Sequence, residues 1–390
     1  MSNKPTIPYG RQSISEADIL AVIDVLRSDW LTQGPAVERF ERAVADYCGA
    51  RFAVAVNSAT SALHISCLAA GLGPGDSLWT TPNTFVASAN CGLYCGAAVD
   101  FVDIDPQTYN MSVDALAKKL EEARSNGSVP KVVIPVHFAG QSCEMDRIHE
   151  LSQKYGFSVI EDASHAIGGR YRKQAIGSCV NSDMTVFSFH PVKIVTTGEG
   201  GMVLTNSEVL YDKLVRLRSH GITRDPDLMR GESHGPWYYQ QIELGFNYRT
   251  TDIQAALGAS QLSRLDEFVR HRHILAKRYD EAFANLPLTL PWQHPDTYSS
   301  YHLYVIRLTL EETKMTHLGV FEALREAGIG VNLHYIPVHS QPYFQRLGFK
   351  AGYCPEAEQY YREAISIPLF HGLKDDDQEY VISAIQKVLR

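Results

Sequence analysis

The pattern of apolar and polar positions predicts two helices followed by a succession of short strands and helices. Apolar side chains recur at helical spacing from Ile19 to Leu26, and Ser15 is suited to cap that helix. The amphipathic segment "PAVERFERAVADYCGA" predicts a second helix that ends at Gly49. Short apolar runs then predict strands at residues 51–57, 77–82, 97–105, 131–138, 157–164, 184–189 and 201–206.

Near-continuous apolar strands that alternate with helices are typical of the α/β class, in which helices cover both faces of a mainly parallel sheet. Functional side chains in such sheets gather beyond the carboxyl ends of the strands. Several of the predicted strands end in polar residues, among them Asn57, Asp162 and Ser188. We therefore expect a functional site along this edge of the sheet.

The last third of the chain predicts a second, smaller α/β unit. A helical pattern covers residues 251–272, a strand is expected at 301–308, and helices are expected near 317–327 and 375–390. The charged, glycine-rich stretch 221–236 predicts a surface loop that is a candidate lid over a site.

Length and composition are those of a folded protein with two lobes. Because 390 residues exceed the usual size of a single core, we expect a large domain with an N-terminal arm over residues 1–250 and a smaller C-terminal domain over residues 251–390. The shares of apolar (45%) and charged (21%) residues argue against wholesale disorder. The net charge of −8 gives no concentrated basic face of the kind that binds nucleic acid.

The cellular compartment is inferred from features that the sequence lacks. The N-terminal segment has no charged stretch followed by the apolar core of a secretory signal, and no apolar run reaches the ~20 residues of a membrane helix. The seven cysteines lack the paired spacing of a zinc site, so we interpret them as buried thiols and expect no metal. We expect a cytoplasmic protein that binds neither nucleic acid nor membrane.

Two polar residues at predicted strand ends have the chemistry of a catalytic site. In "FSFHPVKIVTTGEGG" (187–201), Lys193 stands between an apolar strand and a turn rich in threonine and glycine. A lysine held in a site can have its pKa lowered and can then form a Schiff base with a carbonyl compound, whereas a surface lysine on a turn is the alternative. Asp162 ends another strand, where it is suited either to pair with a protonated ring nitrogen or to cap the next helix.

Three further features are compatible with the same ligand. His165 is either a ligand contact or a satisfied interior histidine. "NSATSALH" (57–64) predicts a helix N-terminus that favours a bound phosphate, although an ordinary cap explains Ser58 or Thr60 equally well. Phe85 could lie against a planar cofactor or belong to the core. Together, a lysine amine, a carboxylate, a phosphate cup and an aromatic plate indicate pyridoxal 5'-phosphate.

The chain resembles the DegT/StrS family of pyridoxal-phosphate-dependent sugar aminotransferases over roughly residues 8–385. The resemblance is carried by "NSATSAL", "TTPNTFVASAN", "EDASHAIGG", "FSFHPVKIVTTGEGG", "RSHGITR", "LGFNYRTTDIQAALGASQL" and "NLHYIPVH". It implies the type I aminotransferase fold, with a seven-stranded, mainly parallel sheet in a large cofactor-binding domain and a smaller C-terminal α/β domain. It also implies a homodimer whose active sites lie between the subunits.

The resemblance further implies roles for individual residues. Lys193 would bind the cofactor covalently and move protons, Asp162 would hold the pyridine nitrogen, His165 would lie near the ring hydroxyl, and Phe85 would stack on the ring. The residues implied at the phosphate are Ala59, Thr60, Ser188, Arg249 and, from the partner subunit, Asn247. The residues implied at the border of the sugar site are His334 and Tyr335, in the family's HY-x-P turn.

Within the family, "LTQGPAVERFE", "SHAIG" and "NLHYIPVHSQPYF" look most like the pseudaminic acid branch. That branch moves an amino group from L-glutamate to C4 of a UDP-linked 4-keto-6-deoxy-N-acetylhexosamine. His165 agrees with it, whereas many relatives have glutamine at this position. The alternative substrates are those of other nucleotide-sugar 3- or 4-aminotransferases, of the perosamine, 4-amino-arabinose or bacillosamine type.

Two readings from other functional classes are disfavoured. The known sugar dehydratases of this fold that depend on pyridoxal phosphate carry histidine at the position of Lys193. A non-catalytic regulator that retains the cofactor is opposed by the acidic balance and by the absence of an added helix-turn-helix segment.

Overall fold

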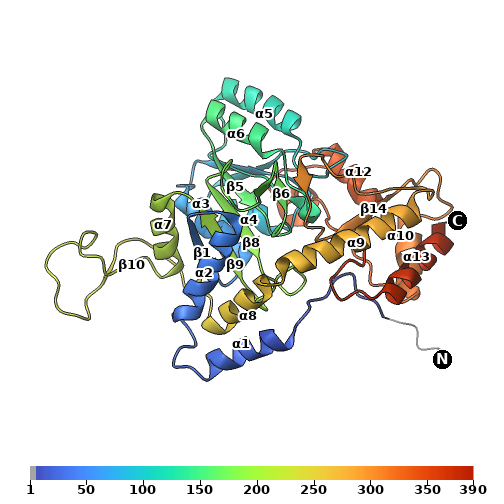
Figure 1. Ribbon diagram of the computed structural model, residues 1–390. Coiled ribbons are helices and arrows are strands. Elements are labelled where there is room, and N and C mark those ends of the chain that lie inside the picture. Colours follow the sequence, from blue (N-terminus) through green and yellow to red (C-terminus); the bar gives the residue numbers. More distant parts are fainter. Residues whose placement is uncertain (1–5, 390) are drawn as a thin grey trace.

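A seven-stranded sheet forms the centre of the molecule (Figure 1). The computed structural model describes residues 6–389, so the ends of the two expected domain ranges, residues 1–5 and 390, lie outside the described residues. In chain order the strands of this sheet are β1 (Phe52–Val56), β2 (Ser77–Thr80), β3 (Ala98–Phe101), β4 (Val132–Ile134), β5 (Ser158–Asp162), β8 (Met184–Ser188) and β9 (Gly201–Thr205). Each lies within one of the predicted runs.

The order of the strands in the sheet is β1-β9-β8-β5-β4-β2-β3. The neighbours β8, β5, β4, β2 and β3 pair in parallel, whereas β9 pairs antiparallel with both β8 and β1. The expected mainly parallel sheet is therefore confirmed. Because parallel strands end at the same edge, β5 and β8 place their last residues side by side.

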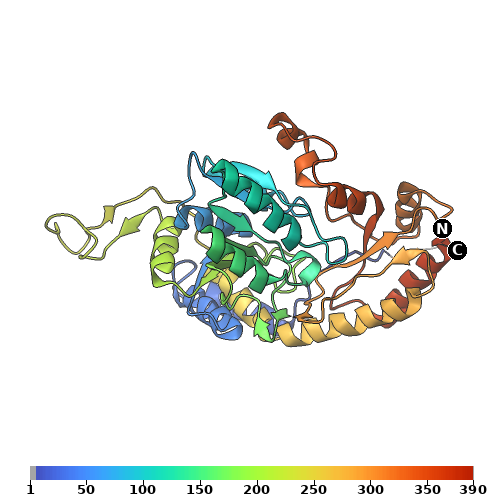
Figure 2. The same cartoon turned by 90° about the horizontal axis from the view of Figure 1, so that it is seen from above.

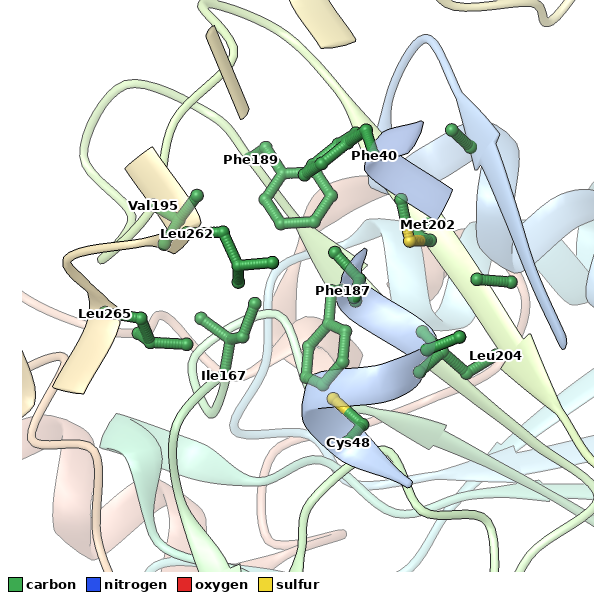
Figure 3. Close-up of a cluster of buried hydrophobic side chains, with 14 of the residues drawn as sticks. Phe40, Cys48, Ile167, Phe187, Phe189, Val195, Met202, Leu204, Leu262 and Leu265 are labelled. Carbon is green, nitrogen blue, oxygen red and sulfur yellow. The ribbon is translucent and has the colours of Figure 1, made fainter. Parts of the chain in front are cut away.

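Each face of the sheet is covered by its own helices, because successive side chains of a strand point to opposite faces. Ala55 of β1 belongs to a core cluster with α2 (Pro35–Cys48), α8 (Asp252–Leu262) and α9 (Leu265–Phe283). Its neighbour Val56 belongs to a cluster with α3 (Ala59–Ala69), α4 (Ala87–Tyr94) and α7 (Glu208–Arg218). Figure 3 shows the first cluster, in which Phe40 of α2 lies against Phe189 and the ring of Phe187 of β8 lies next to Cys48 at the end of α2.

Several helices begin and end as the sequence predicts. Ser15 caps α1 (Glu16–Leu26) and forms a reciprocal capping box with Asp18. Helix α2 ends at Gly49, whose φ of 76° is the left-handed conformation that glycine adopts without strain. The remaining elements near the large sheet are α5 (Val113–Asn126), α6 (Met145–Tyr155), the short 3-10 helix η1 (Phe138–Gly140), and a small sheet of β6 (Arg170–Tyr171), β7 (Gln174–Ala175) and β13 (Thr297–Tyr298).

A second, three-stranded sheet lies in the last third of the chain (Figure 2). Its strands are β12 (Leu288–Thr289), β14 (Tyr304–Leu308) and β15 (Ala364–Ile367). Together with α10 (His317–Glu326) and α13 (Asp375–Leu389) it forms a core cluster of its own, which the second half of α9 also joins. The other local elements are η2 (Val338–Ser340), α11 (Pro342–Arg346) and α12 (Pro355–Glu363). The domain boundary expected near residue 250 stays a prediction.

Two predicted segments differ in detail from the structure. The single helical pattern over residues 251–272 is two helices, α8 and α9, separated by Ser263 and Arg264. The predicted loop at 221–236 lies within a long hairpin whose short strands are β10 (Ile222–Thr223) and β11 (Gln240–Gln241). This hairpin projects away from the body of the chain (Figures 1 and 2).

Two expectations from composition can be compared with the structure. All seven cysteines are buried and none forms a disulfide bond, which confirms their interpretation as buried thiols. Among residues 6–389, no helix combines the length and the apolar character needed to cross a membrane.

Candidate functional site

A cavity of about 970 Å³ opens at the carboxyl ends of β5 and β8, where the sequence predicts a functional site. Its wall includes the first residues of α3, the turn after β8 and residues 332–335. The predicted site residues that line it are Ala59, Thr60, Phe85, Asp162, His165, Ser188, Lys193, His334 and Tyr335. The structure thus brings these residues together, and their individual roles stay predictions.

Lys193 lies in a turn that folds back onto the end of β8. The carbonyl of Phe189 accepts hydrogen bonds from the backbone N–H of Thr197 at 3.0 Å and from the hydroxyl of Thr196 at 3.1 Å. Burial lowers the pKa of Lys193 to about 8, against the opposing effect of the charge on Asp162. Much of the amine is therefore neutral near pH 8, and the neutral form attacks carbonyl groups and accepts protons.

Asp162 ends β5 with its side chain only 5% exposed, so its carboxylate requires partners. The hydroxyl of Ser88, on α4, donates to Oδ2 at 2.6 Å, and the backbone N–H of Ser164 donates to Oδ1 at 3.1 Å. The hydroxyls of Ser88 and Thr84 are also hydrogen-bonded to each other at 2.7 Å. These contacts fix the carboxylate at the cavity wall and leave lone pairs for a cationic ligand.

The N-terminus of α3 forms a second polar part of the wall. Ser58 caps the helix by accepting a hydrogen bond from the N–H of Ser61 at 3.1 Å. The N–H groups of Ala59 and Thr60 belong to the first turn, where a helix offers them no acceptor. Gly201 packs against this turn so closely that an added Cβ would lie 2.6 Å from the nitrogen of Ala59. Such a helix start is suited to bind phosphate.

Ser188 and Phe85 stand at two other parts of the wall. Ser188 is the last residue of β8, pairs in register with Gly201, and lines the same cavity as the start of α3. The ring of Phe85 is 60% exposed, although a phenylalanine is usually buried. A large exposed ring in the wall of a cavity is suited to lie against a flat ligand.

Two buried imidazoles complete the wall on the side of residues 332–335. Nδ1 of His165 accepts a hydrogen bond from the N–H of Ala139 at 3.3 Å, and its Nε2 lies 3.1 Å from the hydroxyl of Tyr335. Nδ1 of His334 lies 2.8 Å from the hydroxyl of Ser366. Burial lowers the pKa of His334 to about 3 and holds the pKa of His165 well below its ordinary value. Both rings are therefore neutral at ordinary pH.

Sequence reasoning missed three residues that contribute to the site. His302, only 4% exposed, lines the cavity with its ring 4.4 Å from that of His165. Its signal was a polar residue at the start of the apolar run 301–308. Tyr9, whose ring lies 5.3 Å from His334, and Ser88, which holds Asp162, gave no local signal, because both act through contacts made only in the folded chain.

Asn247 and Arg249 lie outside the wall that the single chain forms. Asn247 is exposed and stands opposite Ser219 in an isolated antiparallel bridge. Arg249 stands opposite Val56, at the end of the strand that leads into α3. Their implied contacts with phosphate, one of them across a subunit boundary, stay predictions.

The residues of the wall fit pyridoxal 5'-phosphate. The start of α3 suits the phosphate, and the close approach that Gly201 permits is a structural sign of a shaped cradle there. The exposed ring of Phe85 suits the flat pyridine, the anchored carboxylate of Asp162 suits a protonated ring nitrogen, and the amine of Lys193 suits the aldehyde.

Comparison with known proteins gives similarity over nearly the whole chain. The model of the DegT/DnrJ/EryC1/StrS aminotransferase family matches residues 12–386. The chain is 41% identical over 387 residues to the spore coat polysaccharide biosynthesis protein SpsC of Bacillus subtilis, covering 98% of this chain and 97% of that protein. It is 37% identical over 384 residues to the UDP-4-amino-4,6-dideoxy-N-acetyl-beta-L-altrosamine transaminase of Campylobacter jejuni, covering 98% and 97%.

Solved structures agree with the fold expected from sequence. Helicobacter pylori PseC, an aminotransferase involved in the biosynthesis of pseudoaminic acid, superposes with a TM-score of 0.89 at 31% identity, covering 98% of this chain and 99% of that one. The type I fold of pyridoxal-phosphate-dependent aminotransferases is therefore confirmed.

Proposed function

Because this chain belongs to the DegT/DnrJ/EryC1/StrS aminotransferase family, whose members act on sugars with pyridoxal phosphate as cofactor, we propose that it aminates C4 of a UDP-linked 4-keto-6-deoxy-N-acetylhexosamine. L-glutamate is the proposed amino donor and pseudaminic acid the proposed end product. The observation that carries this choice is the end-to-end likeness to the altrosamine transaminase of C. jejuni and to PseC.

Lys193 is the proposed catalytic residue. When bound, the cofactor supplies the electron-withdrawing ring that makes a proton on the amino-bearing carbon removable. With its pKa lowered to about 8, Nζ of Lys193 can accept that proton and return it within one catalytic cycle. Lys193→Ala should remove amination altogether, whereas Lys277→Ala, at an exposed position on α9, should leave it unchanged. Full turnover by the Lys193 variant would contradict this role.

The other wall residues bind and orient. Asp162, held by Ser88, would keep the ring nitrogen protonated, which maintains the electron demand of the ring. The start of α3 and Ser188 would hold the phosphate, and Phe85 would fix the plane of the ring. His334 and Tyr335 are proposed to border the sugar. They line the cavity from a segment far along the chain from the strands that carry the cofactor contacts.

The substrate is tested with a panel of keto sugars. The purified enzyme is offered UDP-, dTDP- and GDP-linked 4-keto and 3-keto sugars with L-glutamate, and each product is identified by NMR. We expect amination at C4 of the UDP-linked N-acetylated sugar, with a kcat/KM at least tenfold above that of every other sugar in the panel. Preference for another sugar would instead favour the alternative, a nucleotide-sugar aminotransferase with a different substrate. The identity with SpsC, which is higher than the identity with the altrosamine transaminase, raises this alternative.

We also propose that the enzyme is a cytoplasmic homodimer with sites shared between subunits. The projecting hairpin exposes Trp237 (71%), and the segment that leads back from it exposes Leu244 (78%), which suits contact with a second copy. Mixing inactive Lys193→Ala with an inactive Asn247→Asp variant tests the shared site. Subunit exchange should restore roughly a quarter of the wild-type activity if Asn247 serves the partner's cavity, and none if each chain is self-sufficient.

A further inference from the structure

The hydrogen bonds of His165 determine which of its nitrogens carries the proton. The backbone N–H of Ala139 points at Nδ1 from 3.3 Å, and a backbone N–H can only donate. Nδ1 is therefore an acceptor, and the proton of the neutral ring is on Nε2. Because Nε2 lies 3.1 Å from the hydroxyl oxygen of Tyr335, the Nε2–H group donates to that oxygen. The proton of the Tyr335 hydroxyl must then point elsewhere.

His165 is held in the neutral form by its surroundings. Burial lowers its pKa well below the ordinary value, and the nearby amine of Lys193 and ring of His334 act in the same direction. A second proton would also have to sit on Nδ1, where it would face the N–H of Ala139. The direction of the hydrogen bond to Tyr335 therefore stays the same across the working pH range.

The orientation of the His165 ring is fixed by the segment that precedes β14. The hydroxyl of Ser300 donates to the carbonyl of His165 at 2.8 Å, and the ring of His302 packs against the His165 ring at 4.4 Å. This segment is itself held by the buried guanidinium of Arg272, which donates to the carbonyls of Tyr301 at 3.1 Å and His302 at 3.2 Å. Tyr301 has a φ of +47°, a conformation that a non-glycine residue keeps only when its neighbours enforce it.

We infer that Tyr335 is a catalytic hydrogen-bond donor to the carbonyl oxygen of the keto substrate, that His165 sets the direction of its O–H, and that His302 is a positioning residue for His165. The inference deepens the proposed function and rests on it, because the carbonyl belongs to the proposed acceptor. Tyr335 and Lys193 line the same cavity. When an amine adds to a carbonyl carbon, the oxygen gains negative charge, and a donor already aimed at it stabilises that charge.

Tyr335 is suited to donate a hydrogen bond without losing its proton. Burial raises the pKa of its hydroxyl above the ordinary value, and the charge of Asp162 raises it further, so the group stays protonated near neutral pH. Its backbone N–H is held by the side-chain oxygen of Asn83 at 3.2 Å, which limits movement of the residue.

The kinetic test removes or preserves one hydrogen bond at a time. Tyr335→Phe should lower kcat/KM for the keto sugar about 10²-fold, the cost of deleting one preorganised donor, whereas Tyr343→Phe, at an exposed tyrosine, should leave it unchanged. His165→Leu cannot donate to Tyr335 and should reproduce most of the loss. His165→Gln can accept from Ala139 and donate to Tyr335, so it should retain activity within a fewfold of wild type.

A double substitution tests whether His165 acts through Tyr335 or whether the two residues contribute to activity separately. Because His165 is proposed to act through Tyr335, His165→Leu combined with Tyr335→Phe should lose no more than Tyr335→Phe alone. Multiplied losses, or a Tyr335→Phe enzyme within twofold of wild type, would overturn the inference. His302→Ala should lose activity and His302→Phe, which keeps a flat ring against His165, should recover most of it.

A spectroscopic test does not depend on the identity of the sugar. In protein labelled with 15N-histidine, the His165 signals are assigned by their absence from His165→Gln. We expect a protonated Nε2 and an unprotonated Nδ1, in the wild type and in Tyr335→Phe alike. A proton on Nδ1, or a cationic ring, would overturn the inference. A wild-type enzyme that aminates a different keto sugar would refute only the proposed substrate, and the same variants would then be compared on that sugar.

Discussion

The cradle at the start of α3 depends on the absence of a side chain at position 201. In Gly201→Ala, the added Cβ would lie 2.5 Å from the carbonyl carbon of Ser58 and 2.6 Å from the nitrogen of Ala59. Carbon atoms in contact are normally about 3.5 Å apart, so the start of α3 and β9 must separate by about 1 Å. Both neighbours are backbone atoms, which cannot rotate away as a flexible side chain would.

The displacement should weaken binding of the phosphate more than it weakens the fold. Overpacking of this kind costs about 1–3 kcal/mol. If the strain is relieved by moving the N–H groups of α3, the dissociation constant for pyridoxal phosphate should rise about 10- to 100-fold, at about 1.4 kcal/mol for each factor of ten. Gly73→Ala is the matched control, since a Cβ there has no heavy atom within 4 Å.

The assay compares two ligands that differ only in the phosphate. Cofactor-free wild type, Gly201→Ala and Gly73→Ala are titrated with pyridoxal phosphate and with pyridoxal, and binding is followed by absorbance. The Gly201 variant should lose affinity for pyridoxal phosphate but bind pyridoxal much as the wild type does. Equal losses of affinity for both ligands would show that the substitution disturbs the whole site. Unchanged affinity for pyridoxal phosphate would refute the idea that the start of α3, packed against Gly201, binds the phosphate.

Three other properties of the described residues lead to predictions. In the cofactor-free protein, the rate at which Lys193 reacts with pyridoxal should rise with pH through a midpoint near pH 8, because burial lowers its pKa to about 8 and the neutral amine is the nucleophile. Asp162→Asn should move this midpoint to lower pH, because the charge of Asp162 raises the pKa of Lys193. A midpoint near pH 10 would contradict the burial argument. Ser88→Ala removes the 2.6 Å hydrogen bond to the Asp162 carboxylate and should lower the free energy of unfolding in urea by about 1–3 kcal/mol, with weaker cofactor binding. Glu161→Gln leaves the buried imidazole of His137 without the carboxylate 2.5 Å away and should cost about 3–5 kcal/mol in the same measurement, and a loss below 1 kcal/mol would show that the pair is not charged.

The strands of the large sheet could be predicted because a strand buried on both faces is apolar almost throughout. The runs around Val132 and Val159 are of this kind, and each contains the observed strand. The reversed direction of β9 could not be predicted, because the same apolar pattern serves a parallel or an antiparallel neighbour. The break between α8 and α9 was missed since Ser263 and Arg264 contain neither proline nor glycine to mark it.

The part of the site that could be predicted consists of charged residues that stand next to apolar, buried strands. Lys193 and Asp162 stand out because a charged group beside a buried strand needs a reason. The supporting contacts were not predictable in the same way. Ser88 and Asp162 are separated by 74 residues, and Tyr335 and His165 by 170, so their meeting depends on the tertiary fold.

The wall of the cavity draws its parts from two regions of the sequence that fold around different sheets. The candidate cofactor contacts come from α3, from the segment before α4, and from the ends of β5 and β8 with the turns that follow them. His302, His334 and Tyr335 come instead from segments next to β14 and β15. Evolution, or an engineer, can therefore diversify residues 332–334 and 336 to accept a new sugar while Tyr335, residues 300–302 and the cofactor contacts are kept. A library confined to those four positions should yield altered specificity more often than loss of the cofactor.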